Sequence, residues 1–255
     1  MATRSNNNRA VGDEAWSHFY RIGATAAFVT IIVMISEIVI TFLPGGGRVA
    51  PEEVTIVNWL ELFQDNWFLG LRNLGLINMI AVVLLIPTFV ALFGALRADH
   101  EPWAALALVI SVAGAAVYLA GNTGLPMLAL SRQYAAAATE AQRAAIEAAG
   151  QAMLALGESH TPGTFVAFLL IESGGLLNSW LMLRSEYFAR ATAVAGLFGN
   201  GMLLTFEFVS AFVPALFAMS LFIALAGGLL SLAWYVLIGR DLLRLGRVVP
   251  AMRVA

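Results

Sequence analysis

The sequence contains no cysteine and no lysine among its 255 residues. Without cysteine the chain forms no disulfide bond, no thiolate zinc site and no cysteine nucleophile. Charge of either sign is also scarce, because only 12% of the residues are charged, about half the 25% or so of a soluble domain. The formal net charge of -2 and the lack of a basic run argue against a nucleic-acid partner.

The sequence contains long apolar runs with few charged residues. The residues are 60% hydrophobic, and the mean hydropathy is +0.82. Since a helix of about 20 apolar residues crosses a bilayer, the runs predict an all-α fold, an integral membrane bundle of six transmembrane helices forming a single domain over residues 1–255. The predicted spans are about residues 22–43, 74–96, 103–121, 164–183, 192–210 and 215–236.

Two polar segments between the spans predict short extracytoplasmic interfacial helices. Residues 55–68 alternate apolar and acidic positions at helical spacing, which is typical of a helix lying in the membrane interface. Residues 131–157 are rich in Ala, Glu and Gln, and Thr139 followed by Gln142 matches a capping box. We interpret this second segment as a solvated helical insertion that ends at Gly157, before Pro162.

Arginines are distributed unequally between the predicted loops, which predicts the orientation of the chain. With both termini on the cytoplasmic side, ten of the 14 basic residues lie on that side and four on the other. The cytoplasmic set is Arg4, Arg9, Arg21, Arg97, Arg184, Arg190, Arg240, Arg244, Arg247 and Arg253, and the outer set is Arg48, Arg72, Arg132 and Arg143. The lipid bilayer is therefore the predicted surrounding, with both termini in the cytoplasm.

Three predicted spans each contain a single carboxylate: Glu37, Glu172 and Glu207. An ionisable group at the centre of a span costs roughly 2.5–3.5 kcal/mol on insertion scales, so each of the three requires a partner or a use. At 1.5 Å of rise per residue, the predicted orientation places all three in the outer half of the bilayer. We therefore predict that they converge at one level.

Further polar residues enter the same level from the outer side, and we predict one site composed of Glu37, Arg72, Asn78, Asn122, Glu172 and Glu207. Three interpretations of this group remain open. Arg72 neutralises one carboxylate and only fixes helix packing; or the group binds a small molecule or ion in an outward-facing pocket; or the polar groups simply extend toward the outer surface.

Few chemistries fit these residues. The three histidines lack H-x-x-x-H and E-x-x-H spacing, so no metal site is predicted, and no G-x-S-x-G or phosphate-loop motif occurs. No cofactor can be assigned, and the sequence does not indicate an enzyme. The leading hypothesis is small-molecule or ion binding. The alternatives are an intramembrane enzyme that uses the carboxylates as acid and base on a lipid-like substrate, and an accessory subunit beside a membrane-protein partner; a homo-oligomer also stays open.

Three runs of the chain resemble a known family. They are GNTGLPMLALSRQYAAAATEAQRAAIEAAGQAMLALGESHTPGTF, LMLRSEYFARATAVAGLFGN and AFVPALF. They are similar to the bacterial six-span proteins that carry domain of unknown function 4386. The resemblance implies a small multi-pass protein of the bacterial inner (cytoplasmic) membrane, and it supplies no activity, cofactor or catalytic residue.

Overall fold

The computed structural model describes residues 2–42, 55–157 and 160–251, and within them it contains helices and no strand. Leu43, Arg48 and Arg253, which entered the predictions above, lie outside these residues. The helical elements are α1 (Ala2–Phe42), α2 (Ile56–Asp65), α3 (Trp67–Asn73), α4 (Leu76–Gly121), α5 (Gly124–Ala136), α6 (Glu140–Gly157), α7 (Phe165–Met182), α8 (Arg190–Phe212), the 3-10 turn η1 (Pro214–Leu216) and α9 (Phe217–Ala251).

Five helical segments are long and apolar enough to cross a membrane, which confirms the predicted all-α membrane bundle. They are Trp16–Ile40, Leu76–Ala136, Phe165–Met182, Arg190–Phe212 and Pro214–Arg247. The second segment contains a reversal, so the predicted spans 74–96 and 103–121 lie on its two arms. The number of six crossings stays a prediction.

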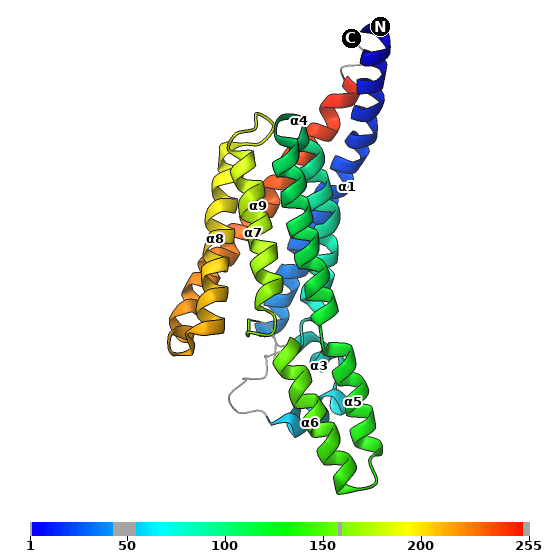
Figure 1. The fold of residues 1–255 in the computed structure, drawn as a ribbon, viewed down its shortest axis with the longest axis vertical. Coiled ribbons are helices and arrows are strands. Elements are labelled where there is room, and N and C mark those ends of the chain that lie inside the picture. Colours follow the sequence, from blue (N-terminus) through cyan, green and yellow to red (C-terminus); the bar gives the residue numbers. More distant parts are fainter. Residues whose placement is uncertain (1, 43–54, 158–159, 252–255) are drawn as a thin grey trace.

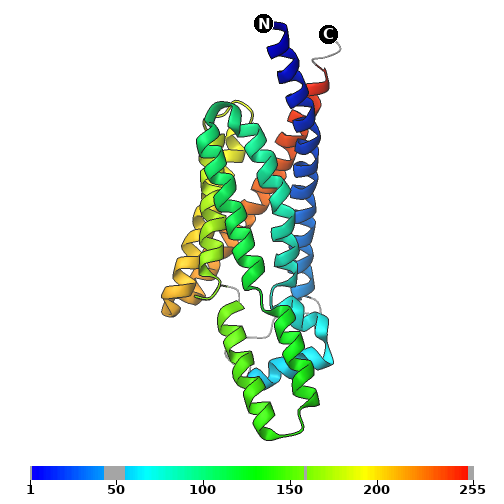
Figure 2. The same cartoon turned by 45° about the vertical axis from the view of Figure 1, so that its right-hand side comes forward.

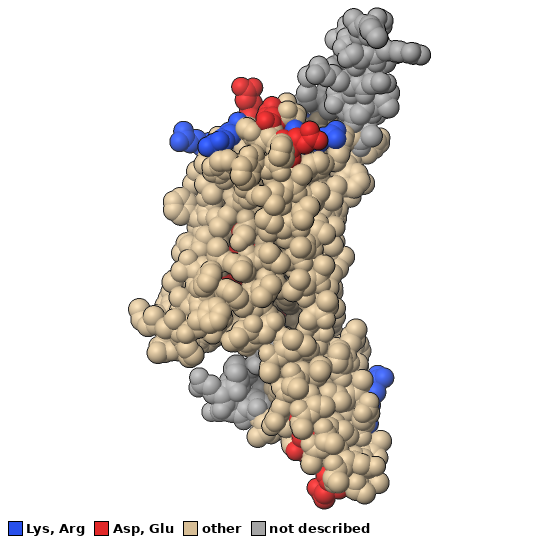
Figure 3. Space-filling view, in the orientation of Figure 1, with Lys and Arg blue, Asp and Glu red and all other residues tan. Residues whose placement is uncertain are grey.

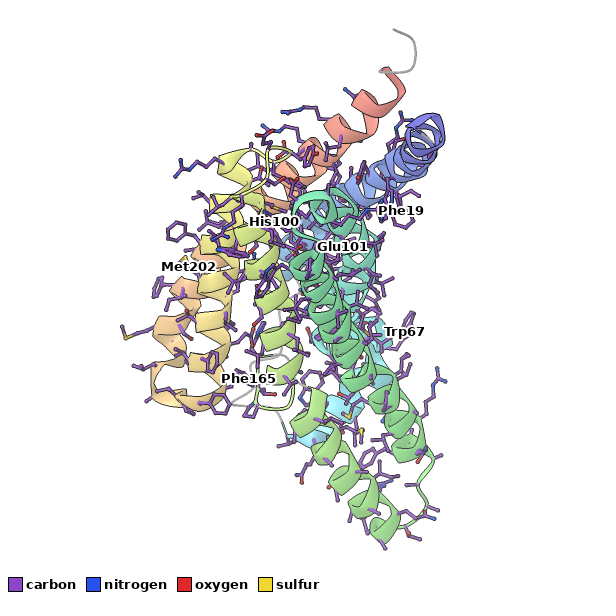
Figure 4. All side chains as sticks on the ribbon, turned by 45° about the horizontal axis from the view of Figure 1, so that its top comes forward. Phe19, Trp67, His100, Glu101, Phe165 and Met202 are labelled. Carbon is purple, nitrogen blue, oxygen red and sulfur yellow. The ribbon has the colours of Figure 1, made fainter. Side chains whose placement is uncertain are left out.

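The reversal inside α4 occurs at His100, whose φ of -142° and ψ of 46° are not helical. Pro102 follows two residues later; it has no amide hydrogen to continue the helical hydrogen-bond ladder and disfavours helix in the residue before it. Figure 4 labels His100 and Glu101 at this turn, and Figure 1 shows the two arms of α4 running side by side from it. The turn lets one continuous helical segment contribute two neighbouring rods to the bundle.

The bundle is a closed ring in chain order. Helix α1 packs against α4, α4 against α7, α7 against α8, α8 against α9, and α9 returns to α1. Both chain termini lie at one end of this ring, which we call the terminal end; the opposite end, toward α2, α3, α5 and α6, is the lobe end (Figures 1 and 2). At the terminal end the interior is an apolar core that includes Phe89, Leu92, Trp234, Ile238 and Leu242.

Helices α2, α3, α5 and α6 form a small lobe with an apolar core of its own, containing Leu60, Phe63, Leu74 and Met127. Within it the amphipathic segment 55–68 is broken at Asn66, whose side chain accepts a hydrogen bond from the Leu69 amide and caps α3. Trp67, one residue later, points away from the bundle in Figure 4.

The insertion at 131–157 differs in one respect from the single helix predicted. Residues 131–136 are the end of α5, and the chain turns before α6 begins at Glu140. The predicted capping box causes that new start: the Gln142 amide donates to Thr139 Oγ1 and the Thr139 amide donates to Gln142 Oε1, both at 3.2 Å. The cap satisfies amides that a helix start leaves unpaired.

Charged side chains avoid the middle of the bundle. In Figure 3 the blue and red residues gather at the terminal end and on the lobe, and the flank between them is almost entirely tan. Large apolar side chains of the bundle helices are exposed, among them Ile32 on α1, Val109 on α4, Phe198 on α8 and Phe222 on α9. An apolar belt of this kind is suited to contact with lipid acyl chains.

Close helix contacts in the bundle depend on glycine, which gives a direct test of the packing. A Cβ atom at Gly114 would lie 2.8 Å from the backbone nitrogen of Ile171, so Gly114→Ala must push α4 and α7 apart. We expect it to lower the free energy of unfolding by about 1–3 kcal/mol. Gly228 in α9 has no atom within 4 Å of the added carbon, so Gly228→Ala should stabilise by up to about 1 kcal/mol through helix propensity. Thermal unfolding in detergent micelles compares them; equal effects would contradict the α4–α7 contact.

Candidate functional site

The three predicted carboxylates are all buried, but they do not form one group. As whole residues, Glu37 is 9% exposed, Glu172 8% and Glu207 2%. Glu37 lies near the end of α1, Glu172 two turns into α7, and Glu207 near the end of α8. All three lie toward the lobe end of their helices, yet each has a different environment.

Glu37 forms a two-pronged ion pair with Arg72 of α3. Arg72 Nε donates to Glu37 Oε2 at 3.0 Å and Arg72 Nη2 donates to Glu37 Oε1 at 3.1 Å. The guanidinium is completely buried, so the pair joins the lobe to the bundle at a place shielded from water. Bidentate geometry of this type is the strongest form of carboxylate recognition by arginine. The carboxylate that Arg72 neutralises is therefore Glu37. For Glu37, the interpretation that fits is an ion pair that fixes helix packing.

Asn122 and Asn78 separate from the carboxylates as well. The Asn122 amide nitrogen donates to the Leu74 carbonyl at 2.7 Å, and its Oδ1 accepts from the Gly124 amide at 3.0 Å. Its side chain thus links the end of α4 to the α3–α4 junction and the start of α5, and its hydrogen bonds go to backbone groups. Asn78 lies half-buried in the first turn of α4.

Glu207 is joined to His160, a contact that the sequence did not indicate. His160 Nδ1 and Glu207 Oε1 lie 2.6 Å apart. The imidazole ring stacks on Phe168 of α7, with centroids 5.0 Å apart, and meets Phe206 of α8 edge-on at 4.9 Å. The imidazole is thereby fixed between two helices, with 30% of its surface still exposed.

The backbone of His160 shows how firmly that side chain is held. Its φ of 63° is in the left-handed region, which non-glycine residues rarely adopt. Such a conformation costs on the order of 1–3 kcal/mol and persists only where surrounding contacts determine it. The hydrogen bond to Glu207 and the two aromatic contacts are contacts of that kind. The sequence feature that could have indicated a turn at His160 is the pair Pro162 and Gly163, directly before α7.

Glu172 is the least compensated carboxylate. Its Oε2 is buried and has no hydrogen-bond partner among the described residues, and the same holds for Oε2 of Glu207. The two carboxylates, on neighbouring helices, lie within electrostatic range of each other, so the charge of Glu207 acts on Glu172. We call Glu172, Glu207 and His160 the carboxylate site.

The carboxylate site does not have the form of a metal centre built from side chains. Within the described residues, no group of three or more His, Asp or Glu is placed to hold a metal ion. The arrangement can bind or release a proton and can attract one small cation, because two acidic oxygens in an apolar surrounding lack a donor.

A fourth buried acid, Asp241 of α9, was not among the predicted site residues. Its Oδ2 accepts from the Thr192 hydroxyl at 2.7 Å and from the Ala189 amide at 3.2 Å, where α8 begins. Its Oδ1 accepts from Arg240 at 3.0 Å. Asp241 thus accepts hydrogen bonds from groups at the start of α8 that the helix itself leaves without a partner. Its position in an arginine-rich stretch made it resemble a solvated charge.

The ion pair between Glu37 and Arg72 leads to a prediction about stability. Arg72→Met leaves the Glu37 carboxylate buried without its cation, and we expect a loss of about 3–5 kcal/mol of unfolding free energy. The double variant Glu37→Gln with Arg72→Met removes both charges and should recover most of that loss. Chemical denaturation in micelles gives the values; a double variant as unstable as Arg72→Met would show that charge compensation is not the role of the pair.

Comparison with known proteins identifies the family of the chain. No curated protein and no solved structure matches the chain. The family model for the domain of unknown function DUF4386 matches residues 22–238, which include every candidate span at least in part as well as the carboxylate site. The match covers most of the 255 residues, and the chain therefore belongs to the DUF4386 family of domains of unknown function.

Proposed function

We propose that this protein is a multi-pass protein of the bacterial inner membrane that binds one small cation, a proton or Na⁺, at Glu172 and Glu207. The observation that carries the proposal is the pair of buried carboxylates on α7 and α8, each with one oxygen that lacks a donor within the part of the chain that the structure describes. Unpaired acidic oxygens in an apolar bundle are costly unless they are used.

Charge balance favours a single positive charge as the ligand. If His160 is protonated, it neutralises Glu207 at 2.6 Å, and the carboxylate site keeps one negative charge on Glu172. If His160 is neutral, the two carboxylates repel each other more strongly. In both cases one added monovalent cation brings the net charge of the site nearer to zero. A divalent ion would leave the site with a net positive charge when His160 is protonated.

The ligand would enter from the lobe end, which we propose faces outward. His160 is the exposed member of the carboxylate site, and it precedes α7 at the lobe end. Glu37 and Arg72 do not join the binding group in this proposal, since they neutralise each other. Of the six residues predicted for the site, this proposal keeps Glu172 and Glu207, and it adds His160.

The orientation proposal rests on the arginines. Arg184, Arg190, Arg240, Arg244 and Arg247 lie exposed at the terminal end, as expected for a cytoplasmic face. The enzyme and accessory-subunit alternatives, and a second copy of the chain as partner, stay predictions from the sequence.

Cation binding predicts a change in thermal stability. In detergent micelles of constant ionic strength, replacing choline chloride by NaCl, or lowering the pH, should raise the melting temperature of the wild-type protein. A ligand at 100 times its dissociation constant stabilises by about 2.7 kcal/mol. Glu172→Gln and Glu207→Gln should each lose the response, because each removes one acidic oxygen pair.

Glu140→Gln is the matched control, since its side chain on α6 is 93% exposed and outside the site. It should respond as the wild type does. The Na⁺ and pH series separate the two cations. Cation binding at the carboxylate site would be refuted if the wild-type melting temperature changed with neither Na⁺ nor pH. It would also be refuted if the two site variants responded as strongly as the wild type.

The absence of native cysteine makes the orientation directly testable. Ala138→Cys lies in the exposed turn between α5 and α6, and Glu186→Cys lies in the exposed turn between α7 and α8. A membrane-impermeant maleimide should label the first in intact spheroplasts and the second only after the membrane is opened. The reverse labelling pattern would invert the proposed topology.

A further inference from the structure

Buried polar side chains continue from the carboxylate site toward the terminal end. They lie at the contacts of α4 with α7, of α7 with α8 and of α8 with α9, and each is at most 4% exposed. We call them the inner polar set: Ser111 of α4, Ser179 of α7, Asn200 of α8, and Ser231 and Trp234 of α9. Buried groups of this type in a membrane bundle are either interhelical contacts or part of a pathway.

Glycines bring the inner polar set together. Added Cβ atoms at Gly174, Gly175 and Gly199 would meet Ser111, Asn200 and Ser231 respectively. The same atom at Gly196 would meet both Ser179 and Trp234. Because these glycines have no side chain, polar groups of α4 and α8 approach α7, and polar groups of α7 and α9 approach α8.

Several of these groups lack hydrogen-bond partners. Ser111 Oγ, Ser231 Oγ and Trp234 Nε1 are buried and unpaired among the described residues, in addition to Oε2 of Glu172 and of Glu207. Native proteins satisfy almost all buried polar atoms, and ordered water does so where side chains do not. We infer that a file of buried water between these groups satisfies the unpaired atoms.

The polar groups follow one another along α7 and α8 in steps of about 4.5–6 Å. Glu172 is three residues from Gly175, about 4.5 Å along α7, where Asn200 lies. Gly196, beside Ser179 and Trp234, is four residues from Thr192, about 6 Å along α8. Thr192 donates to Asp241, which also contacts the exposed Arg240. The file therefore reaches from the carboxylate site to the terminal end.

We propose that this file conducts protons, so that the cation bound at Glu172 and Glu207 is a proton that crosses the membrane to Asp241. The inference rests on the proposed cation site and names its ligand. The hydroxyl groups, with the buried water between them, suit relayed protons, because each can accept one proton and donate another.

The transfer balances without an oxidant or a second substrate. A proton from the outer water binds a Glu172 or Glu207 carboxylate, and the carboxyl group then gives it to a neighbouring water. Each water or serine hydroxyl accepts one proton and donates another, and Trp234 Nε1, which only donates, orients a water. The proton leaves through the Asp241 carboxylate to cytoplasmic water, driven by the proton gradient. The titratable groups facing Glu172 are Glu207 on α8 and Tyr235 on α9.

Flux through the protein can be measured in vesicles. The full chain is reconstituted into phosphatidylglycerol–phosphatidylcholine vesicles containing a pH-sensitive dye, and a potassium diffusion potential is applied with valinomycin. We expect proton flux at least about tenfold above protein-free vesicles, with Glu172→Gln at background. The double variant Ser111→Ala with Ser231→Ala should be slower by about tenfold, the effect of one lost hydrogen-bond partner on a barrier.

Two further measurements make the result decisive. Thr205→Ala removes a hydroxyl that is exposed on α8 and bonded to the Gly201 carbonyl, so it should conduct as the wild type does. The serine double variant should keep the pH response of its melting temperature, because Glu172 and Glu207 are intact. The single Ser231→Ala variant replaces the double one if that does not fold.

The outcomes separate the two proposals. Wild-type flux at background, or a folded serine variant that conducts like the wild type, overturns the pathway. If the melting temperature of the wild type still responds to cations in that case, the binding site survives without the pathway. If the melting temperature does not respond either, both proposals fail.

Discussion

Hydrocarbon surroundings tolerate a charge only when another group compensates it, and this constraint orders the polar features of the bundle. Glu37 meets a guanidinium, Asp241 meets a helix start, a hydroxyl and an arginine, and Glu207 meets an imidazole. The negative charges of Glu37 and Glu207 toward the lobe end and of Asp241 at the terminal end are thus compensated, and that of Glu172 is compensated least. A carboxylate that the protein itself leaves without a donor is where an external cation gains most.

Glycine contacts connect packing with the candidate activity. Helices in a membrane have little hydrophobic drive to associate with one another, so they rely on close approach of small residues. In this bundle the same glycines that let α7 and α8 touch their neighbours also admit Ser111, Asn200 and Ser231 to the contact. Packing alone would be served by apolar partners, since unpaired hydroxyls destabilise it. Their presence at glycine contacts is the reason that we propose a pathway along this seam.

The lobe has a direct mechanical link to the bundle. Arg72 belongs to α3 of the lobe and pairs with α1, while Asn122 bonds across from the end of α4 to the Leu74 carbonyl. Arg72 pairs with Glu37 on α1, whereas Glu172 lies on α7, which packs against α4 and α8. The ion pair therefore holds the lobe in place, and the carboxylate site is the part of the predicted polar level that we propose binds a cation.

Much of the architecture followed from the sequence, because hydropathy, helix-breaking residues and caps act locally. The apolar runs, the capping box at Thr139 and the placement of single acids in spans are properties of short segments. Helical phase, however, assigns a residue to a face and not to a neighbour. The pairing of Arg72 with Glu37, the backbone role of Asn122 and the reach of His160 through a left-handed turn depend on how the helices are ordered and tilted. Only the tertiary structure decides those contacts, since each joins groups from segments that are far apart along the chain.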